Sequence, residues 1–377
     1  MPDRLRTPSY IPELDGLRGL AIAAVLFYHC HTKLESSHLD VIARWGWTGV
    51  NLFFVLSGFL ITGIILDSRD DPRFFRNFYA RRGLRIWPVY FLLLLLNFFV
   101  VPFVFGNFWW AIHEVRTAQW THYIFFIQNL LFAAMPGTLG PTWSLAIEEQ
   151  FYVFWAPLAR FTRNAILLPL LIAIFIASPL VRLANTGSLG PFHGFLTEVH
   201  TLTHLDGLAI GSLVALSLRM FNFSRASWGR FAAGGLVAGI AGAVMMPFHG
   251  SNFTDSLLAL GFGGMLIAAL LVTGRQTAYG RFLTWRPLKY LGTISYGLYL
   301  IHVLCFVLIG AFDLKMEKYG MGGDLAVVGV RLILSISAAT LLWYGFERPI
   351  LRLKKYFVSK PHSTQVREPA PVLVAAD

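Results

Sequence analysis

The sequence predicts an all-α, polytopic integral membrane protein of about ten transmembrane helices, with both termini on the cytoplasmic side. Hydrophobic residues make up 56% of the chain and charged residues only 14%, whereas soluble domains carry roughly 25% charge. Apolar runs of about 20 residues, the length that crosses a bilayer, recur along the chain. Because unpaired backbone groups cannot face lipid, these runs are expected to form helices.

Ten apolar runs give the expected helices in order. They lie roughly at residues 15–31, 47–66, 84–105, 143–160, 165–184, 201–218, 231–248, 254–273, 290–311 and 325–345. A further run near residues 120–134 fits a half-helix or a re-entrant piece. Residues 1–358 are expected to form one transmembrane domain. Residues 359–377, rich in Pro, Ser and charge, are expected to be a disordered cytoplasmic tail.

Basic residues alternate between loops. The loops on the side of the termini carry Arg69, Arg73, Arg76, Arg81, Arg82, Arg160, Arg163, Arg219, Arg225, Arg230, Arg275, Arg281, Arg286 and Lys289. The intervening loops carry only Lys33, Arg44, Arg116, Arg182, Lys315 and Lys318. Since basic residues accumulate on the cytoplasmic side, both termini are placed there. This topology accounts for the formal net charge of +11, so no nucleic-acid partner is expected.

No metal site is expected from the sequence. The two cysteines, Cys30 and Cys305, both lie inside apolar runs and have no metal-ligand spacing. Ionisable residues inside the runs are different, because they are costly in a membrane and mark functional sites by default.

The first run contains Arg18 and His29. They are about three helical turns apart and within roughly 20° of one face, with His29 roughly 16 Å further from the cytoplasm. His29 has the side chain whose pKa suits general-base catalysis near neutral pH. The alternative is an interfacial histidine with an arginine that extends to the lipid headgroups.

The fourth run opens with Ser144 and Glu148, four residues apart and therefore on one helix face. The predicted topology puts Glu148 at the depth of His29, where a carboxylate would fix the tautomer of the histidine. The alternative is that the acidic residues of this segment face water at the start of the helix.

Before the third run lies a basic amphipathic segment that includes Arg82 and Arg85. It is expected to be either an interfacial helix that binds anionic lipid or a clamp for a phosphorylated cytosolic donor, because guanidinium groups match phosphate geometry. Three weaker signals are Asp206 near the outer end of the sixth run, His302 in the ninth, and Glu347, expected to pair with Arg348 at the interface.

Together these stretches resemble the membrane-bound acyltransferase family 3. The matching blocks, in family order from about residue 10 to 350, are IPELDGLRGLAIAAVLFYH, GVNLFFVLSGFLITG, NFYARRGLRIWPVY, PTWSLAIEEQFYVFWAP, HLDGLAIGSLVAL, LGTISYGLYLIH and FERP. The chain departs from the family pattern at Asn51, where Asp is common, and at His204, where Arg is common. The usual Trp-Pro after His302 is also missing.

The resemblance implies a multi-pass enzyme of the cell inner membrane that transfers an acyl group, most simply acetyl, from cytosolic acyl-CoA to a hydroxyl. Succinyl or another short chain stays open. The acceptor is expected to be a carbohydrate or a glycosylated small molecule, with cell-surface polysaccharide, lipopolysaccharide, periplasmic glucan, peptidoglycan and macrolide-type acceptors all open. Acyl-CoA is a substrate, and no permanently bound cofactor is expected. Membrane lipids are the remaining partners.

In that reaction the phosphates of acyl-CoA are expected at Arg82, Arg85 and Arg18. His29 is expected to act as general base or transient acyl carrier, with Glu148 orienting it and with Ser144 and Asp206 positioning the acceptor. The rival hypothesis is a proton-coupled transporter or flippase that uses the same groups as a relay. Transporters often contain internal repeats, and none is found here. A lipid or sterol sensor without chemistry is a third possibility.

Overall fold

The computed structural model describes residues 10–30, 33, 39–101, 103, 120–131, 137–186, 199–249, 252–310, 316 and 319–357. All regular structure in these ranges is helical, which confirms the predicted all-α class. The predicted tail, residues 359–377, lies outside the described residues.

Each of the ten apolar runs forms one long helix. The ten are α1 (Pro12–His29), α3 (Gly49–Ser68), α4 (Phe74–Leu95), α9 (Thr142–Phe161), α10 (Asn164–Thr186), α11 (Leu205–Met220), α12 (Arg225–His249), α13 (Thr254–Val272), α15 (Arg286–Leu308) and α17 (Gly320–Leu342). Short helical pieces join them, namely α2 (Leu39–Arg44), η2 (Trp45–Thr48), η3 (Leu96–Val100), α7 (Trp120–Ile124), α8 (Gln128–Leu131), η5 (Gly137–Leu139), η6 (Thr201–Thr203), α14 (Ala278–Leu283), η8 (Trp343–Glu347), α18 (Arg348–Leu351) and η9 (Arg352–Tyr356).

Seven helical segments of the described chain are long and apolar enough to cross a membrane. They are Ile42–Ser68, Phe74–Val100, Asn164–Asn185, Arg225–Met246, Thr254–Val272, Arg286–Leu308 and Gly320–Tyr356. The remaining long helices are α1 and α9, which carry charged side chains within their length, and α11, which has 16 residues. The count of ten spans and the cytoplasmic side of the termini therefore remain predictions.

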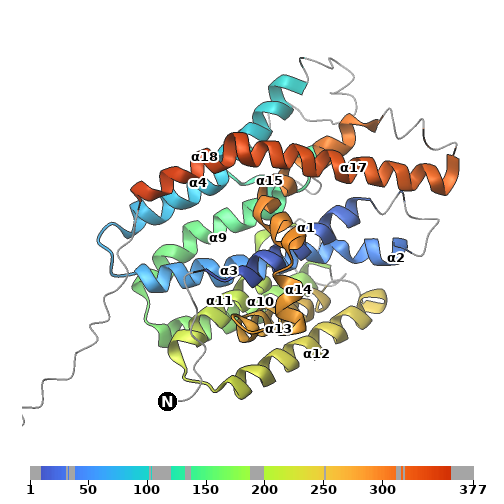
Figure 1. Ribbon diagram of the computed structural model, residues 1–377. Helices are drawn as coiled ribbons and strands as arrows, with labels where there is room; N and C mark the ends of the chain where they lie inside the picture. Colours follow the sequence, from blue (N-terminus) through green and yellow to red (C-terminus); the bar gives the residue numbers. More distant parts are fainter. Residues whose placement is uncertain are drawn as a thin grey trace, which may run out of the picture.

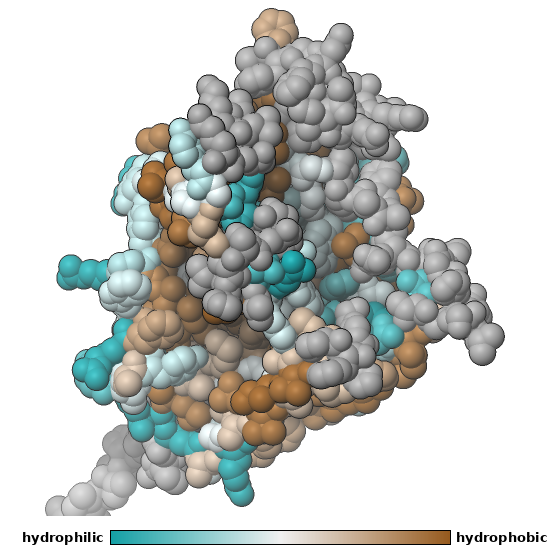
Figure 2. Space-filling model, turned by 90° about the vertical axis from the view of Figure 1, so that its right-hand side faces the viewer, coloured by the Kyte–Doolittle hydropathy of each residue, from teal (hydrophilic) through white to brown (hydrophobic). Residues whose placement is uncertain are grey.

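The long helices lie alongside one another with α1 in the middle of the bundle, packed between α15 and α3 (Figure 1). At one edge α12 packs on α13, and at the opposite edge α17 lies beside α15 and α18 beside α4. Apolar side chains on α12 face outward, with Val237, Ile240 and Val244 each more than 60% exposed. Hydrophobic atoms also spread over the lower surface in Figure 2. Both features are typical of a lipid-facing exterior.

Glycines bring the central helices unusually close. A Cβ atom at Gly292 of α15 would lie 1.9 Å from the carbonyl oxygen of Asp15 in α1. A Cβ atom at Gly211 of α11 would lie equally close, 1.9 Å, to the carbonyl oxygen of Val55 in α3. Inside a membrane, helices associate through close packing rather than through the hydrophobic effect, and small residues permit that close packing. The backbones of the central helices are therefore fixed relative to one another, and so are the side chains between them.

The basic segment around Arg82 and Arg85 is part of α4, which runs without a break from Phe74 to Leu95 around the internal Pro88. The basic segment is therefore continuous with a bundle helix and is not a helix of its own. Because the segment is the first half of a bundle helix, one of its faces is turned into the protein. Similarly, the run near residues 120–134 forms two short helices, α7 and α8, in its described part.

Candidate active site

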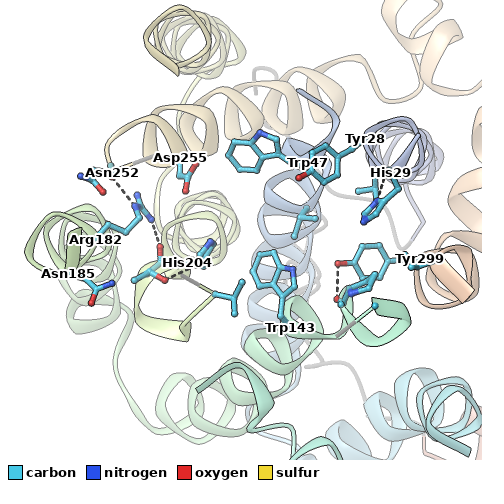
Figure 3. Close-up of a pocket in the computed structure, with 18 residues that line it drawn as sticks. Tyr28, His29, Trp47, Trp143, Arg182, Asn185, His204, Asn252, Asp255 and Tyr299 are labelled. Atoms are coloured by element: carbon cyan, nitrogen blue, oxygen red, sulfur yellow. Dashed lines mark hydrogen bonds between the residues drawn. The ribbon is translucent and has the colours of Figure 1, made fainter. Parts of the chain in front are cut away.

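A cavity of about 520 Å³ lies near the C-terminal end of α1 (Figure 3). We call it the outer cavity, after its side in the predicted topology. In Figure 3 Tyr28, His29 and Tyr299 lie on one side of it and Trp47 and Trp143 lie in the middle. A polar group occupies the other side and consists of Arg182, Asn185, His204, Asn252 and Asp255. The volume falls within the roughly 300–1,000 Å³ of small-molecule sites.

His29 lines this cavity in a defined tautomer. Its Nδ1 lies 2.9 Å from the carbonyl oxygen of Val25, and a carbonyl can only accept, so Nδ1 carries the proton. The Nε2 of His302 lies 3.3 Å from the same Nδ1 and is a second acceptor. His302 is itself fixed by donating from Nδ1 to the carbonyl oxygen of Tyr299 at 2.7 Å. The lone pair of His29 is therefore on Nε2, the atom that can take a proton from a substrate.

The partner of His29 is thus His302, which the sequence marked only as a weak signal. It is completely buried, whereas His29 is partly exposed. Glu148, expected to orient His29, instead accepts from Ser57 at 2.7 Å and from Tyr152 at 2.8 Å. Both carboxylate oxygens of Glu148 thus accept hydrogen bonds from residues other than His29. The expectation that Glu148 orients His29 is therefore wrong.

Glu148 lines a second, smaller cavity of about 120 Å³ together with the arginines predicted to bind the donor, Arg18, Arg82 and Arg85. We call this the middle cavity. The predicted convergence of the three arginines, from α1 and α4, is confirmed. Ser144 lines the same cavity. Glu148 and Ser144 therefore lie with the arginines rather than on the far side with His29, as the sequence had suggested.

The three guanidinium groups differ in their partners. Arg18 pairs with Asp15 at 3.0 Å. Arg85 pairs with Glu347 at 2.7 Å. The expected pair between Glu347 and Arg348 is thus wrong, because the π-helical turn η8 places Glu347 toward α4. Arg82 forms no ion pair with any residue in the described ranges, so its charge is the one most available to an anionic ligand.

Tyr299 stands between the middle and outer cavities. It lines both of them, as does Val50. Its hydroxyl lies 2.6 Å from Ser144 Oγ. Both hydroxyls also lie within hydrogen-bond distance of the carbonyl oxygen of Pro141, at 3.0 Å from Tyr299 and 3.2 Å from Ser144. Ser144 is therefore held at the boundary between the two cavities.

A third cavity, of about 310 Å³, adjoins the middle cavity at Arg18, which lines both. We call it the inner cavity. Its wall includes Tyr10, Asp67 and Arg219, and Arg219 pairs with Asp67. Tyr10 donates to Asp15 at 2.7 Å, and this hydrogen bond, with partial burial, raises the pKa of Tyr10 to about 12. Tyr10 therefore remains a hydrogen-bond donor at physiological pH.

Asp206 does not line the outer cavity. Its carboxylate accepts from Arg182 at 2.8 Å and from Ser256 at 2.7 Å, and the ion pair is almost fully buried. Arg182, which does line the cavity, had been assigned to a loop but lies inside α10. Its contact with Asp206 joins positions 24 residues apart, and no sequence signal links them. Tyr299 was missed for the same reason, because it meets Ser144 from 155 residues away.

Comparison with known proteins gives one family. A family model described as an acyltransferase domain matches residues 11–346. The chain is 30% identical over 367 residues to the protein named "Putative peptidoglycan O-acetyltransferase YrhL" of Bacillus subtilis (strain 168), covering 90% of this chain and 55% of that protein. No solved structure matches the chain significantly.

Two further relatives carry the name OatA. The peptidoglycan O-acetyltransferase of Listeria monocytogenes serovar 1/2a is 26% identical over 329 residues, with 78% of this chain and 49% of the relative covered. The O-acetyltransferase of Staphylococcus aureus (strain NCTC 8325 / PS 47) is 28% identical over 383 residues, with 92% of this chain and 58% of the relative covered. The chain therefore spans about half the length of the relatives that it matches.

Proposed function

The chain belongs to acyltransferase family 3, and from this premise we propose that it is a membrane O-acetyltransferase of the cell inner membrane. It transfers acetyl from cytosolic acetyl-CoA to a hydroxyl of an extracytoplasmic carbohydrate. The relatives named as peptidoglycan O-acetyltransferases support a glycan of the cell wall as the acceptor.

The observation that carries this proposal is the serial arrangement of the three cavities. Arg18 lines both the inner and the middle cavity, and Tyr299 lines both the middle and the outer cavity. Cationic side chains line the inner and middle cavities, and a histidine with an accepting nitrogen lines the outer cavity. A donor from one side of the membrane and an acceptor from the other can meet along such a route.

At the donor end, Arg82 is the principal phosphate ligand, because its guanidinium is in no ion pair within the described chain. Arg18 and Arg85 add positive charge around it. Arginine binds phosphate through two parallel hydrogen bonds, which fixes the orientation of the donor. The small middle cavity suits the extended thioester arm, whereas the nucleotide part fits the larger inner cavity.

At the acceptor end, His29 Nε2 takes the proton of the attacking hydroxyl. The hydroxyl oxygen forms the new ester bond to the thioester carbonyl carbon, the carbon–sulfur bond breaks, and the CoA thiolate leaves and is protonated. The imidazolium that forms on His29 is stabilised because its Nδ1–H already points at Val25 O and His302 Nε2.

The test uses the purified full chain in lipid nanodiscs with radiolabelled acetyl-CoA and soluble glycan strands released from peptidoglycan. His29→Ala should abolish transfer to the glycan yet still bind CoA, whereas Arg82→Ala should weaken CoA binding about tenfold or more. The two variants are controls for each other, since each keeps what the other loses. Transfer at the wild-type rate by His29→Ala would refute the proposed base. In sealed proteoliposomes, glycan movement across the bilayer without acetyl-CoA consumption would favour the flippase instead.

A further inference from the structure

Asp255 is a buried carboxylate whose role the proposed reaction leaves open. It stands in the first turn of α13, is 4% exposed and lines the outer cavity. Its Oδ1 has no hydrogen-bond partner among the described residues. A buried carboxylate oxygen without a donor is costly, and such groups in native proteins call for an explanation.

The neighbouring arginine does not supply the missing partner. Arg182 donates to Asp206 at 2.8 Å, to Ser256 at 2.7 Å and to the carbonyl oxygen of Asn252 at 2.9 Å, and it also donates to the carbonyl oxygen of Thr203. These contacts join α10 to α11, α13 and η6. Arg182 is therefore committed to holding this wall of the cavity together.

A second acceptor lies on the same side of the cavity. The Nδ1 of His204 lies 2.8 Å from Thr203 Oγ1, and that hydroxyl donates its own proton to the carbonyl oxygen of His200 at 2.6 Å. Thr203 must therefore accept from His204, which puts the proton on Nδ1 and leaves Nε2 as an acceptor. Asp255 and His204 both line the outer cavity, and their acceptors Oδ1 and Nε2 suit a ligand that presents hydrogen-bond donors.

Flat apolar surfaces separate this acceptor pair from His29. Figure 3 shows Trp47 and Trp143 between the polar side, with Asp255 and His204, and the side with His29. The ring of Trp143 meets that of His204 edge-on, with centroids 5.0 Å apart. Aromatic rings suit the apolar C–H faces of a pyranose, and acceptors at the edge suit its hydroxyl and amide hydrogens.

We propose that Asp255 and His204, with Trp143 beside them, form the subsite that binds the acceptor sugar and holds it across the outer cavity from His29. The inference rests on the proposed function and adds the groups that recognise the acceptor. The ligand is a neutral pyranose that donates hydrogen bonds from one edge to Asp255 Oδ1 and His204 Nε2. Its reacting hydroxyl lies at the opposite edge, toward His29 Nε2. Asp255 is a positioning residue and takes no proton in the reaction.

The experiment uses Asp255→Asn in the full chain in nanodiscs, with Asp324→Asn as the matched control. Asp324 is a partly exposed aspartate at the start of α17 and lines none of the three cavities. The probe is the soluble glycan fraction from peptidoglycan, without and with acetyl-CoA. Three quantities are measured: the KM for glycan, the KM for acetyl-CoA, and the rise in melting temperature that glycan alone produces.

Asp255→Asn should raise the KM for glycan about 10- to 100-fold, the range for a lost hydrogen bond to a charged group. The KM for acetyl-CoA should not change. The melting temperature without glycan should change little, because Oδ1 has no hydrogen-bond partner among the described residues. The glycan-induced rise in melting temperature should disappear in this variant and persist in Asp324→Asn.

An unchanged KM for glycan would overturn the subsite. If the unliganded variant then also melted at a lower temperature, Asp255 would be a structural residue. The binding measurement separates the two proposals. If glycan stabilises the wild type but no acetyl group is transferred, the proposed function fails and the subsite stands. If acetyl is transferred and Asp255→Asn binds glycan normally, the subsite fails and the function stands.

Discussion

Replacing Asp206 by Asn should destabilise the protein rather than remove a catalytic group. The side chains of Arg182 and Asp206 are 5% and 7% exposed, so the change leaves a buried guanidinium without its counter-charge. Breaking a buried pair in this way costs about 3–5 kcal/mol. The amide would also replace the oxygen that accepts from the backbone N–H of Gly207 at 3.0 Å, or the one that accepts from Ser256.

The assay is thermal unfolding of the detergent-purified protein, followed by tryptophan fluorescence at several heating rates because membrane proteins often unfold irreversibly. Asp206→Asn should melt several degrees lower than the wild type. The double variant Arg182→Met with Asp206→Leu should recover only part of the loss, because it removes the unpaired buried charge but also the hydrogen bonds from Arg182 to Ser256 and to the carbonyl oxygens of Asn252 and Thr203. A wild-type melting temperature together with abolished transfer would refute this reasoning and return Asp206 to the chemistry.

Three further predictions concern the close packing of the central helices, the boundary between the middle and outer cavities, and the donor site. Gly292→Ala forces a methyl against a carbonyl of α1 and should cost about 1–3 kcal/mol by thermal melting, whereas Gly234→Ala, with nothing within 4 Å, should not. Tyr299→Phe should slow transfer about 2- to 10-fold, the value of one hydrogen bond, with CoA binding unchanged in equilibrium dialysis. Arg85→Ala should raise the KM for acetyl-CoA less than Arg82→Ala but melt lower, because it alone loses an ion pair.

Much of the fold was predictable because hydropathy is a local property. Every one of the ten apolar runs became a long helix, since lipid leaves the backbone no other way to satisfy its hydrogen bonds. Helix α4 began about ten residues earlier than its apolar run because helical structure does not require apolar side chains when one face is buried in the bundle.

The site was predictable only in part. Arg82 and Arg85 were identified from their charge in an amphipathic segment, Arg18 was added to them through the family resemblance, and all three line one cavity. The depth of Glu148 was assigned from residue counting along one helix, which fixes position along the axis but not which neighbouring helix it faces. Contacts such as His29 with His302 depend on how α1 packs against α15 and have no signature in either segment.

The small middle cavity has a consequence for membrane energetics. A route open to water from one side to the other would let protons flow down the membrane potential, worth about 2.3 kcal/mol for each charge per 100 mV. Tyr299 and Val50, with Ser144 held to Tyr299, stand where the middle and outer cavities meet. If acetyl transfer follows the route proposed above, these residues would also separate the water on the two sides of the membrane, so that the proton gradient is kept while acetyl groups are transferred.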